Sequence, residues 1–143
     1  MTDNVLIPTD GSDRAKDAVE YGLDLAEAYG TKVHVLYVVE TKANYILTVE
    51  LSDEEFEEYE EYGEQVVTEV VDRAADRGLA GTGSVKTGRV PEEIIEYADE
   101  NDIDHIVMGK QGHGAIEKYL GGTAEKVMRM AGIPVTVLGP AAR

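Results

Sequence analysis

Short apolar runs alternate along the chain with longer segments whose apolar residues recur at helical spacing. Five segments are expected to be strands: residues 5–7, 33–39, 84–87, 105–108 and 134–138. The first two have the length and the apolar content of buried strands. Because parallel strands need a crossover connection, strands alternating with helices predict a parallel sheet covered by helices on both faces. The chain has 143 residues and no repeat or linker, so we expect a single α/β domain over residues 1–143.

Four helices are expected between these strands, and glycines mark their ends. The first ends at Gly30, and its core face is predicted to comprise Ala15, Ala18, Val19, Gly22, Ala26 and Tyr29. The second begins with a capping box made by Ser52 and Glu55 and ends at Gly78. Its predicted core face comprises Phe56, Tyr59, Gly63, Val66, Val67, Val70 and Ala74. Residues 40–51 are expected to be irregular.

The two later helices are shorter. The third has Pro91 at its first helical position, where the missing N–H does no harm. Its predicted core face comprises Ile94, Ile95 and Ala98. The fourth follows a glycine-rich stretch over residues 109–122 and stops at Gly132. Its predicted core face comprises Ala124, Val127, Met128 and Ala131.

The net charge narrows the choice of partners. With 29 acidic and 13 basic residues, the formal charge is −16 at pH 7. Such a chain has no basic stripe for nucleic acid and is repelled by anionic membranes, so neither is expected as a partner. Self-repulsion also works against compactness unless salt screens it. We interpret the acidity as adaptation to high salt, with a general contribution to solubility as the alternative.

The sequence also limits the location and the cysteine chemistry of the protein. There is no Cys, which excludes disulfides, thiolate metal sites and Cys nucleophiles. The first eight residues carry no basic residue before the apolar stretch, so no secretory signal is expected. The longest apolar run, 33–39, is far shorter than the ~20 residues that a membrane helix needs. We therefore expect a cytoplasmic protein.

The charge is distributed unevenly. Between Glu50 and Glu64 there are nine acidic residues and no basic one, a pattern typical of a solvated helix face. Residues 109–129 contain four basic and two acidic residues, a net +2 that leaves −18 for the rest. A basic island in so acidic a chain indicates a bound small anion. The alternative is an ordinary alternation of Lys and Glu at helix ends.

Two loops that follow predicted strands have the composition of a ligand site. One is residues 8–12, and the other runs from Gly109 to Thr123 with five glycines before that Thr. Glycines let N–H groups approach an anion, and Gly122-Thr123 opens a helix whose N-terminus attracts negative charge. Lys110 and Lys118 add positive charge nearby. The alternative is that these glycines serve only turns and the helix cap.

The histidines give little support to catalysis or metal binding. His34 is expected to be a core or edge residue, and His105 to pair with its neighbour Asp104. His113 lies in the glycine-rich loop and is a candidate phosphate donor. No His cluster has the spacing of a zinc site, and neither a G-x4-G-K-[ST] nor a G-x-S-x-G motif is present. We identify no catalytic residue and no general base near the glycine-rich loop, so fast hydrolysis of a bound phosphate compound is not expected.

The spacing of the second loop is more specific than its composition. Gly109, Gly112, Gly122 and Thr123 form the pattern G-x2-G-x9-G-T, which resembles the nucleotide signature of the universal stress protein A family. The likeness extends over the whole chain. Its further segments are residues 5–12, 88–94, 104–109, 122–127 and 133–138. A branch of the family lacks this signature and does not bind ATP, so this chain resembles the ATP-binding branch. Its acidity leads us to expect a salt-adapted organism as the source.

The resemblance implies a fold, an assembly and a cofactor. The fold is one universal stress protein domain of the Rossmann-like, adenine nucleotide alpha hydrolase-like kind. It is a doubly wound parallel sheet of five strands in the order 3-2-1-4-5. The assembly is a homodimer joined through the last strand. The cofactors are ATP and Mg²⁺, with the metal bridging the phosphates rather than held by a protein cluster.

The resemblance also implies which residues touch the nucleotide. Asp10, in the loop that begins Pro8-Thr9, would contact the ribose or help to hold a metal. Backbone groups at Val38 would meet the adenine, and Met108 with Gly109 would line the nucleoside. The phosphates would be held by Gly112, Gly122, Thr123 and Ala124, through N–H groups and the Thr hydroxyl.

Three positions depart from the family pattern. Lys110 and Gln111 stand where small or hydroxyl residues followed by Arg or His are more usual. Lys110 is either an additional phosphate ligand or a solvated residue, and we favour the latter. Gly121 replaces an apolar residue.

These observations favour a nucleotide-binding stress-response or signalling module with an unidentified protein partner. The alternative is a slow ATPase or autophosphorylating enzyme of the same fold. A third possibility, a receiver-type phosphoacceptor, needs an Asp after the third strand and a Lys after the fifth. Those strands end instead at Lys86-Thr87 and Leu138-Gly139, which counts against it.

Overall fold

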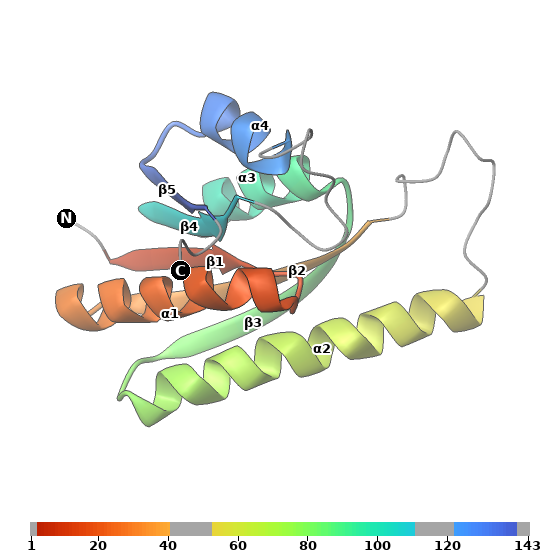
Figure 1. Cartoon of the computed structure of the whole chain (residues 1–143), viewed down its shortest axis with the longest axis horizontal. Helices are drawn as coiled ribbons and strands as arrows, with labels where there is room; N and C mark the ends of the chain where they lie inside the picture. The colour runs from red at the N-terminus through yellow and green to blue at the C-terminus, as the bar shows by residue number, and fades with distance from the viewer. Residues whose placement is uncertain (1–2, 41–52, 111–121, 140–143) are drawn as a thin grey trace.

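The computed structural model describes residues 3–40, 53–110 and 122–139. Its centre is a parallel sheet of five strands in the order β3-β2-β1-β4-β5, which confirms the predicted α/β fold and strand order (Figure 1). The strands are β1 (Asn4–Pro8), β2 (Lys32–Glu40), β3 (Gly81–Gly88), β4 (His105–Gly109) and β5 (Val135–Leu138). The helices are α1 (Asp13–Tyr29), α2 (Asp53–Asp76), α3 (Val90–Glu100) and α4 (Gly122–Met130).

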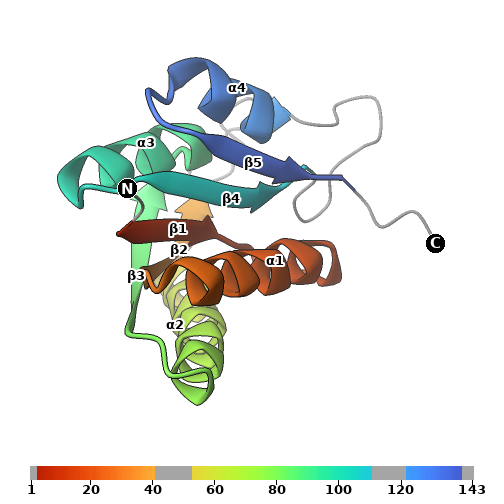
Figure 2. The same ribbon diagram turned by 90° about the vertical axis from the view of Figure 1, so that its left-hand side faces the viewer.

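The sheet separates two apolar cores. The central strand β1 is fully buried at Val5, Leu6 and Ile7, and successive side chains point to opposite faces. Val5 and Ile7 pack into the core beneath α1 and α2, whereas Leu6 packs into the core beneath α3 and α4. Figure 2 shows these two helix pairs on opposite sides of the strands. Burial on both faces explains why the strands are continuous apolar runs rather than alternating ones.

The third strand is longer than the sequence predicted. It begins at Gly81, not at residue 84, and pairs with β2 over its whole length. Its early glycines resemble a turn in the sequence, but they serve close packing against α2. A Cβ added to Gly83 would lie only 2.8 Å from Val67 Cγ2 of that helix. Glycine is therefore required here by a neighbouring helix, which local sequence patterns do not reveal.

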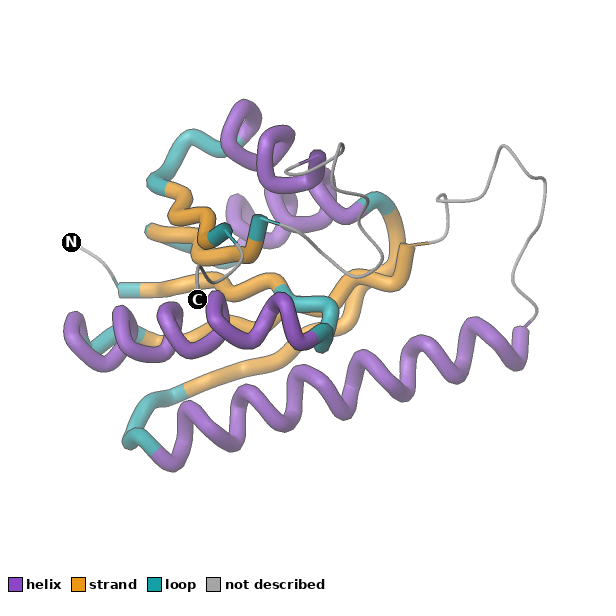
Figure 3. Tube along the Cα trace, viewed as in Figure 1, coloured by secondary structure: helices purple, strands orange, loops and turns teal. Residues whose placement is uncertain are grey.

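Three residues predicted to lie in the core are exposed instead. Tyr29 is 64% exposed because it is the last residue of α1. Tyr59 is 48% exposed because the first half of α2 projects past the sheet, as Figure 3 shows. Met128 is 51% exposed, although its neighbour Val127 is fully buried. Helical periodicity identified the inner stripe of each helix but not where the underlying sheet ends.

The predicted helix ends are confirmed at the two glycines with left-handed backbone. Gly30 and Gly78 have φ of 68° and 78°, values that favour glycine. Pro91 lies in the first turn of α3, one residue later than predicted, because Val90 is already helical. The predicted Ser52 cap and the segment 41–51 lie outside the described residues.

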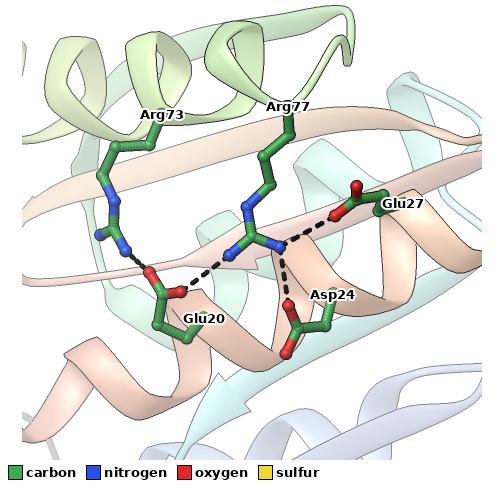
Figure 4. A network of polar contacts seen from close by, with 5 residues as sticks. All are labelled: Glu20, Asp24, Glu27, Arg73 and Arg77. Atoms are coloured by element: carbon green, nitrogen blue, oxygen red, sulfur yellow. Dashed lines mark hydrogen bonds and ion pairs between the residues drawn. The ribbon is translucent and has the colours of Figure 1, made fainter.

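A network of ion pairs joins α1 to α2 (Figure 4). Arg77, which directly follows α2, donates to Glu20, Asp24 and Glu27 on α1 at 2.7–3.2 Å. Arg73 pairs with the same Glu20. Two of the few cations in this acidic chain thus hold together two helices that would otherwise repel each other.

Candidate functional site

The loops predicted to form a site leave neighbouring strands. β1 lies between β2 and β4, and all three run in the same direction. The carboxyl ends of these three strands therefore lie at the same end of the sheet. Figure 2 shows that α1 and α4 both begin at this end, on opposite sides of the strands. β1 and β4 flank the point where the strand order reverses, and α/β sheets bind ligands beyond the carboxyl ends of their strands at such a point.

The loop after β1 is held in shape by hydrogen bonds close to Asp10. Thr9 is buried, and its N–H donates to the Leu36 carbonyl at 2.9 Å. The Thr9 hydroxyl accepts the Gly11 N–H at 3.1 Å, and Asp10 Oδ1 accepts the Ser12 N–H at 2.9 Å. The N-cap of α1 is Ser12, so Asp10 does not occupy the capping position. Asp10 instead orders the turn that precedes the helix.

The end of β2 borders the same region. Pro8, the half-buried last residue of β1, is level with Leu36. Val38 is half-buried on the side of α3 and α4. Its neighbour Tyr37 points to the other face, and its pKa is raised first by burial and then by the negative charges that Tyr62 and Asp10 can carry. The negative charge of Asp10 therefore acts on the Tyr37 hydroxyl, near the end of β2.

The end of β4 supplies the residues predicted to line the nucleoside. Met108 is buried in the core beneath α3 and α4, and Gly109 is the half-buried last residue of the strand. The Lys110 N–H donates to the Leu138 carbonyl at 2.7 Å, and the Lys110 side chain is exposed. Gly112 and His113, predicted to meet the phosphates, lie outside the described residues.

The first turn of α4 has the features of an anion site. Gly122 is exposed, and no atom of the described residues lies within 4 Å of a Cβ added there. Thr123 is half-buried, whereas the Ala124 side chain is only 1% exposed and anchors the turn in the core. The first N–H groups of a helix lack partners within the helix and attract negative charge. This turn is thus anchored in the core at Ala124 and exposed at Gly122.

Within residues 3–40, 53–110 and 122–139, no three His, Asp or Glu side chains gather closely enough to hold a metal ion. Asp10 is a carboxylate in the loop that follows β1 at this end of the sheet. No helix in the same ranges combines the length and the apolar character of a membrane span.

The two described histidines are structural. His34 is buried, as predicted, with Nδ1 2.7 Å from the Tyr97 hydroxyl and Nε2 3.0 Å from Asn4 Oδ1. The predicted pairing of His105 with Asp104 is wrong, because His105 Nε2 lies 2.7 Å from Thr136 Oγ1 of β5. Asp104 instead accepts the N–H groups of Asp3 and Asn4, which lower its pKa.

One part of the site escaped the sequence analysis. Tyr62 of α2 contacts Gly11 in the β1–α1 loop and packs edge-on against Tyr37. These residues are distant in sequence and share no motif. The available signal was only that Gly63, beside Tyr62, falls on the core face of α2 and leaves room for a large neighbouring side chain.

Comparison with known proteins identifies the family. The sequence model of the universal stress protein family matches residues 1–139. The universal stress protein MJ0531 of Methanocaldococcus jannaschii is 32% identical over 136 residues, which span 94% of this chain and 80% of that protein.

Solved structures share the fold. The hypothetical protein MJ0577 matches with a TM-score of 0.78 at 22% identity, covering 100% of this chain and 99% of the other. A universal stress protein solved in complex with cAMP has a TM-score of 0.71 at 22% identity, covering 98% of both chains. A universal stress protein from Archaeoglobus fulgidus in complex with dAMP has a TM-score of 0.67 at 23% identity, covering 96% of this chain and 97% of the other. The chain belongs to the universal stress protein family.

Proposed function

We propose that this chain is a cytoplasmic ATP-binding module whose nucleotide occupancy alters its contacts with a protein partner during stress. One observation carries the proposal: the loops after β1 and β4 leave neighbouring strands at the end of the sheet where α4 begins. Two proteins of the same fold, solved with cAMP and with dAMP, support an adenine nucleotide as the ligand class.

The residues divide the nucleotide between three strand ends. We assign the adenine to the backbone at Val38, beside Pro8 and Thr9, and the ribose to Asp10. Met108 and Gly109 line the nucleoside from the other side. The phosphates face the open first turn of α4, where the N–H groups of Gly122, Thr123 and Ala124 and the Thr123 hydroxyl donate hydrogen bonds. The signature residue Gly112 and the candidate phosphate donor His113 complete this assignment.

Magnesium enters the proposal with the phosphates. When bound, it neutralises phosphate charge, and phosphate and water oxygens supply most of its ligands. This fits a site at which Asp10 is the nearby protein carboxylate. We assign no general base to the phosphates, so we propose binding rather than rapid hydrolysis.

Gly122→Val tests the phosphate assignment. The added side chain meets no atom of the described chain within 4 Å of its Cβ, so folding should be unaffected. It should block the approach of phosphates to the helix N-terminus and weaken ATP binding by about tenfold or more, as expected when charge-assisted hydrogen bonds are lost. Calorimetric titration with Mg-ATP in molar KCl measures the affinity.

Gly132→Val is the matched control. Gly132 lies beyond the other end of α4, and a Cβ there is equally free of contacts. ATP affinity should stay within about twofold of wild type, because the substitution is remote from the proposed site. Unchanged affinity in a folded Gly122→Val protein would contradict the phosphate assignment. Many ATP turnovers per minute by wild type would favour the enzymatic alternative.

Asp10→Ala tests the ribose assignment. Binding should weaken by about 1–3 kcal/mol, the range for losing a charged hydrogen-bond partner. Asp13→Ala is the control. The Asp13 side chain is 94% exposed and forms an ion pair with Lys16. Equal ATP affinities for these two variants would remove Asp10 from the site.

We also propose that the protein is a homodimer joined through β5. This strand lies at an edge of the sheet, and its residues Val135, Val137 and Leu138 are half-buried. An unpaired edge of apolar residues favours pairing with a second copy.

A further inference from the structure

The β1–α1 loop that carries Asp10 rests on α2 at Gly11. Gly11 has φ of 79°, and a Cβ built on it would lie 2.7 Å from Val66 Cγ2 and 2.8 Å from the Tyr62 hydroxyl oxygen. Both side chains of α2 therefore press against the loop backbone. Because Gly11 is joined directly to Asp10, a shift of the loop at this contact would also move Asp10.

Tyr62 is itself held in place from the sheet. Its ring packs edge-on against Tyr37 of β2, with centroids 5.8 Å apart and planes at 74°. Tyr37 in turn packs against Gly63, where an added Cβ would lie 2.6 Å from Tyr37 Cδ1. A continuous line of contacts thus runs from α2 through two tyrosine rings to the loop, and the charge of Asp10 reaches Tyr37.

A cavity lies beside this contact. Its volume is about 230 Å³, and it lies between the start of α1 and the middle of α2. Thr9, Gly11 and Ser12 line it from the loop side, and Tyr62 and Val66 from the helix side. The Ser12 hydroxyl oxygen is buried without a hydrogen-bond partner. With open space on one side, the loop is supported against α2 mainly where Gly11 meets Tyr62 and Val66.

We propose that Tyr62 is a positioning residue for Asp10 and couples nucleotide binding to α2. The inference rests on the proposed function, since it assigns a consequence to nucleotide contact at Asp10. Coupling is reciprocal: if the position of α2 changes the affinity for nucleotide, then nucleotide changes α2 by the same free energy. The helix that responds is the one whose acidic first half projects past the sheet (Figure 3).

Substitutions at Tyr62 test the positioning role. Tyr62 is 45% exposed, so its removal leaves no closed cavity. Tyr62→Ala should weaken Mg-ATP binding about fivefold or more, the lower end of typical coupling between sites. Tyr62→Phe, which removes only the hydroxyl that meets Gly11, should give a smaller loss in the same direction. Tyr59→Ala is the matched control, a tyrosine one turn earlier that is 48% exposed, and its affinity should stay within about twofold.

Two readouts separate positioning from a merely structural role. If Tyr62 acts through Asp10, Tyr62→Ala should cost almost nothing further in an Asp10→Ala background, a non-additivity that a general loss of stability would not produce. Saturating Mg-ATP should also slow hydrogen exchange at residues 59–66 of α2 in wild type but not in Tyr62→Ala.

The outcomes distinguish the two proposals. If wild type binds ATP and Tyr62→Ala and Tyr62→Phe bind it equally well, the positioning role is wrong while the nucleotide site stands. ATP binding that leaves exchange in α2 unchanged would also overturn the coupling. If wild type fails to bind ATP, the proposed function is wrong and the coupling falls with it.

Discussion

At one edge of the sheet β3 pairs with β2 over eight residues, whereas at the other edge β5 pairs with β4 over four. β3 exposes Lys86 and Thr87, and α2 packs so closely on it that only glycine fits at position 83. β5 is half-buried along its whole length and carries no charged residue. The β3 edge is thus long, polar and covered by a long helix, while the β5 edge is short and apolar.

The helices beside the two edges differ in charge as well. α2 has eleven acidic residues and one basic residue, a net −10, whereas α4 has one acidic and two basic residues, a net +1. Each edge strand is also tied inward by a histidine. His34 reaches β3 through Tyr97, which hydrogen-bonds Ser84, and His105 bonds Thr136 of β5 directly. The comparison teaches that the β3 edge lies beside a strongly acidic helix, whereas β5 carries no charged residue and its neighbouring helix α4 is nearly neutral.

The largest expected effect is the loss of the dimer on substitution in β5. Wild type should show a mass of about twice 15.6 kDa by light scattering in molar KCl. Val137→Pro should halve it, because proline removes a donor and obstructs strand pairing. Thr87→Pro, the same change near the exposed end of β3, should leave the dimer intact. A wild-type monomer at micromolar concentration would refute the pairing of β5 edges.

The next effect compares packing near the two edges. Gly83→Val should lower the free energy of unfolding by about 1–3 kcal/mol, because its Cβ would meet Val67 at 2.8 Å and overpack the contact with α2. Gly132→Val, just before β5, meets nothing within 4 Å and should change stability by no more than about 0.5 kcal/mol. Chemical denaturation measures both. Equal stabilities would mean that α2 is not closely packed on β3.

The sequence predicted the fold well because strand and helix patterns are local. Burial on both faces makes β1, β2 and β4 apolar runs, and the bounds of β1, β2, β4 and β5 were predicted to within one residue. β3 was predicted four residues short, three of them at its start, because Gly81 and Gly83 are set by packing against α2 rather than by a strand-like local sequence. The same reason explains the exposed Tyr59, because the end of the sheet under α2 is set by tertiary packing.

The candidate site was predicted in part. Glycine spacing pointed to the loops, and the strand order places β1 beside β4 as the site needs. The approach of Tyr62 to the β1–α1 loop at Gly11 could not be predicted from the sequence, because it depends on how α2 lies across β2 and on which glycines face which rings. Likewise His105 was assigned to its sequence neighbour, although its partner lies on the adjacent strand.

A smaller effect should come from salt. The thermal midpoint should rise steadily from dilute buffer to molar KCl, because salt screens the repulsion within a chain of net charge −16. The charge difference between α2 and α4 predicts which residues cause the rise of the thermal midpoint with salt. Neutralising the exposed Glu58 and Glu61 of α2 to Gln should reduce the rise, whereas Glu125→Gln in α4 should not. A midpoint that is flat or falls with salt would defeat the interpretation as salt adaptation.

The smallest expected effect is a pH dependence of stability that arises from the two histidine ties. Burial, together with the charge of Lys32, lowers the pKa of His34 below its ordinary value of 6.5, and burial alone lowers that of His105. The unfolded chain therefore binds these protons more readily than the folded one. Stability should be fully present above about pH 7 and fall as pH drops below 6.5 toward the folded pKa values.

His34 should account for more of this fall than His105. It is 5% exposed and both ring nitrogens have partners, so a second proton on the ring would displace the donor hydroxyl of Tyr97 in a buried place. The test is chemical denaturation between pH 7.5 and 5, above the range where Asp104 is protonated. His34→Gln should flatten the curve more than His105→Gln, whose site at the β5 edge is half-buried. Equal flattening by both variants would show that His34 is no more enclosed than His105.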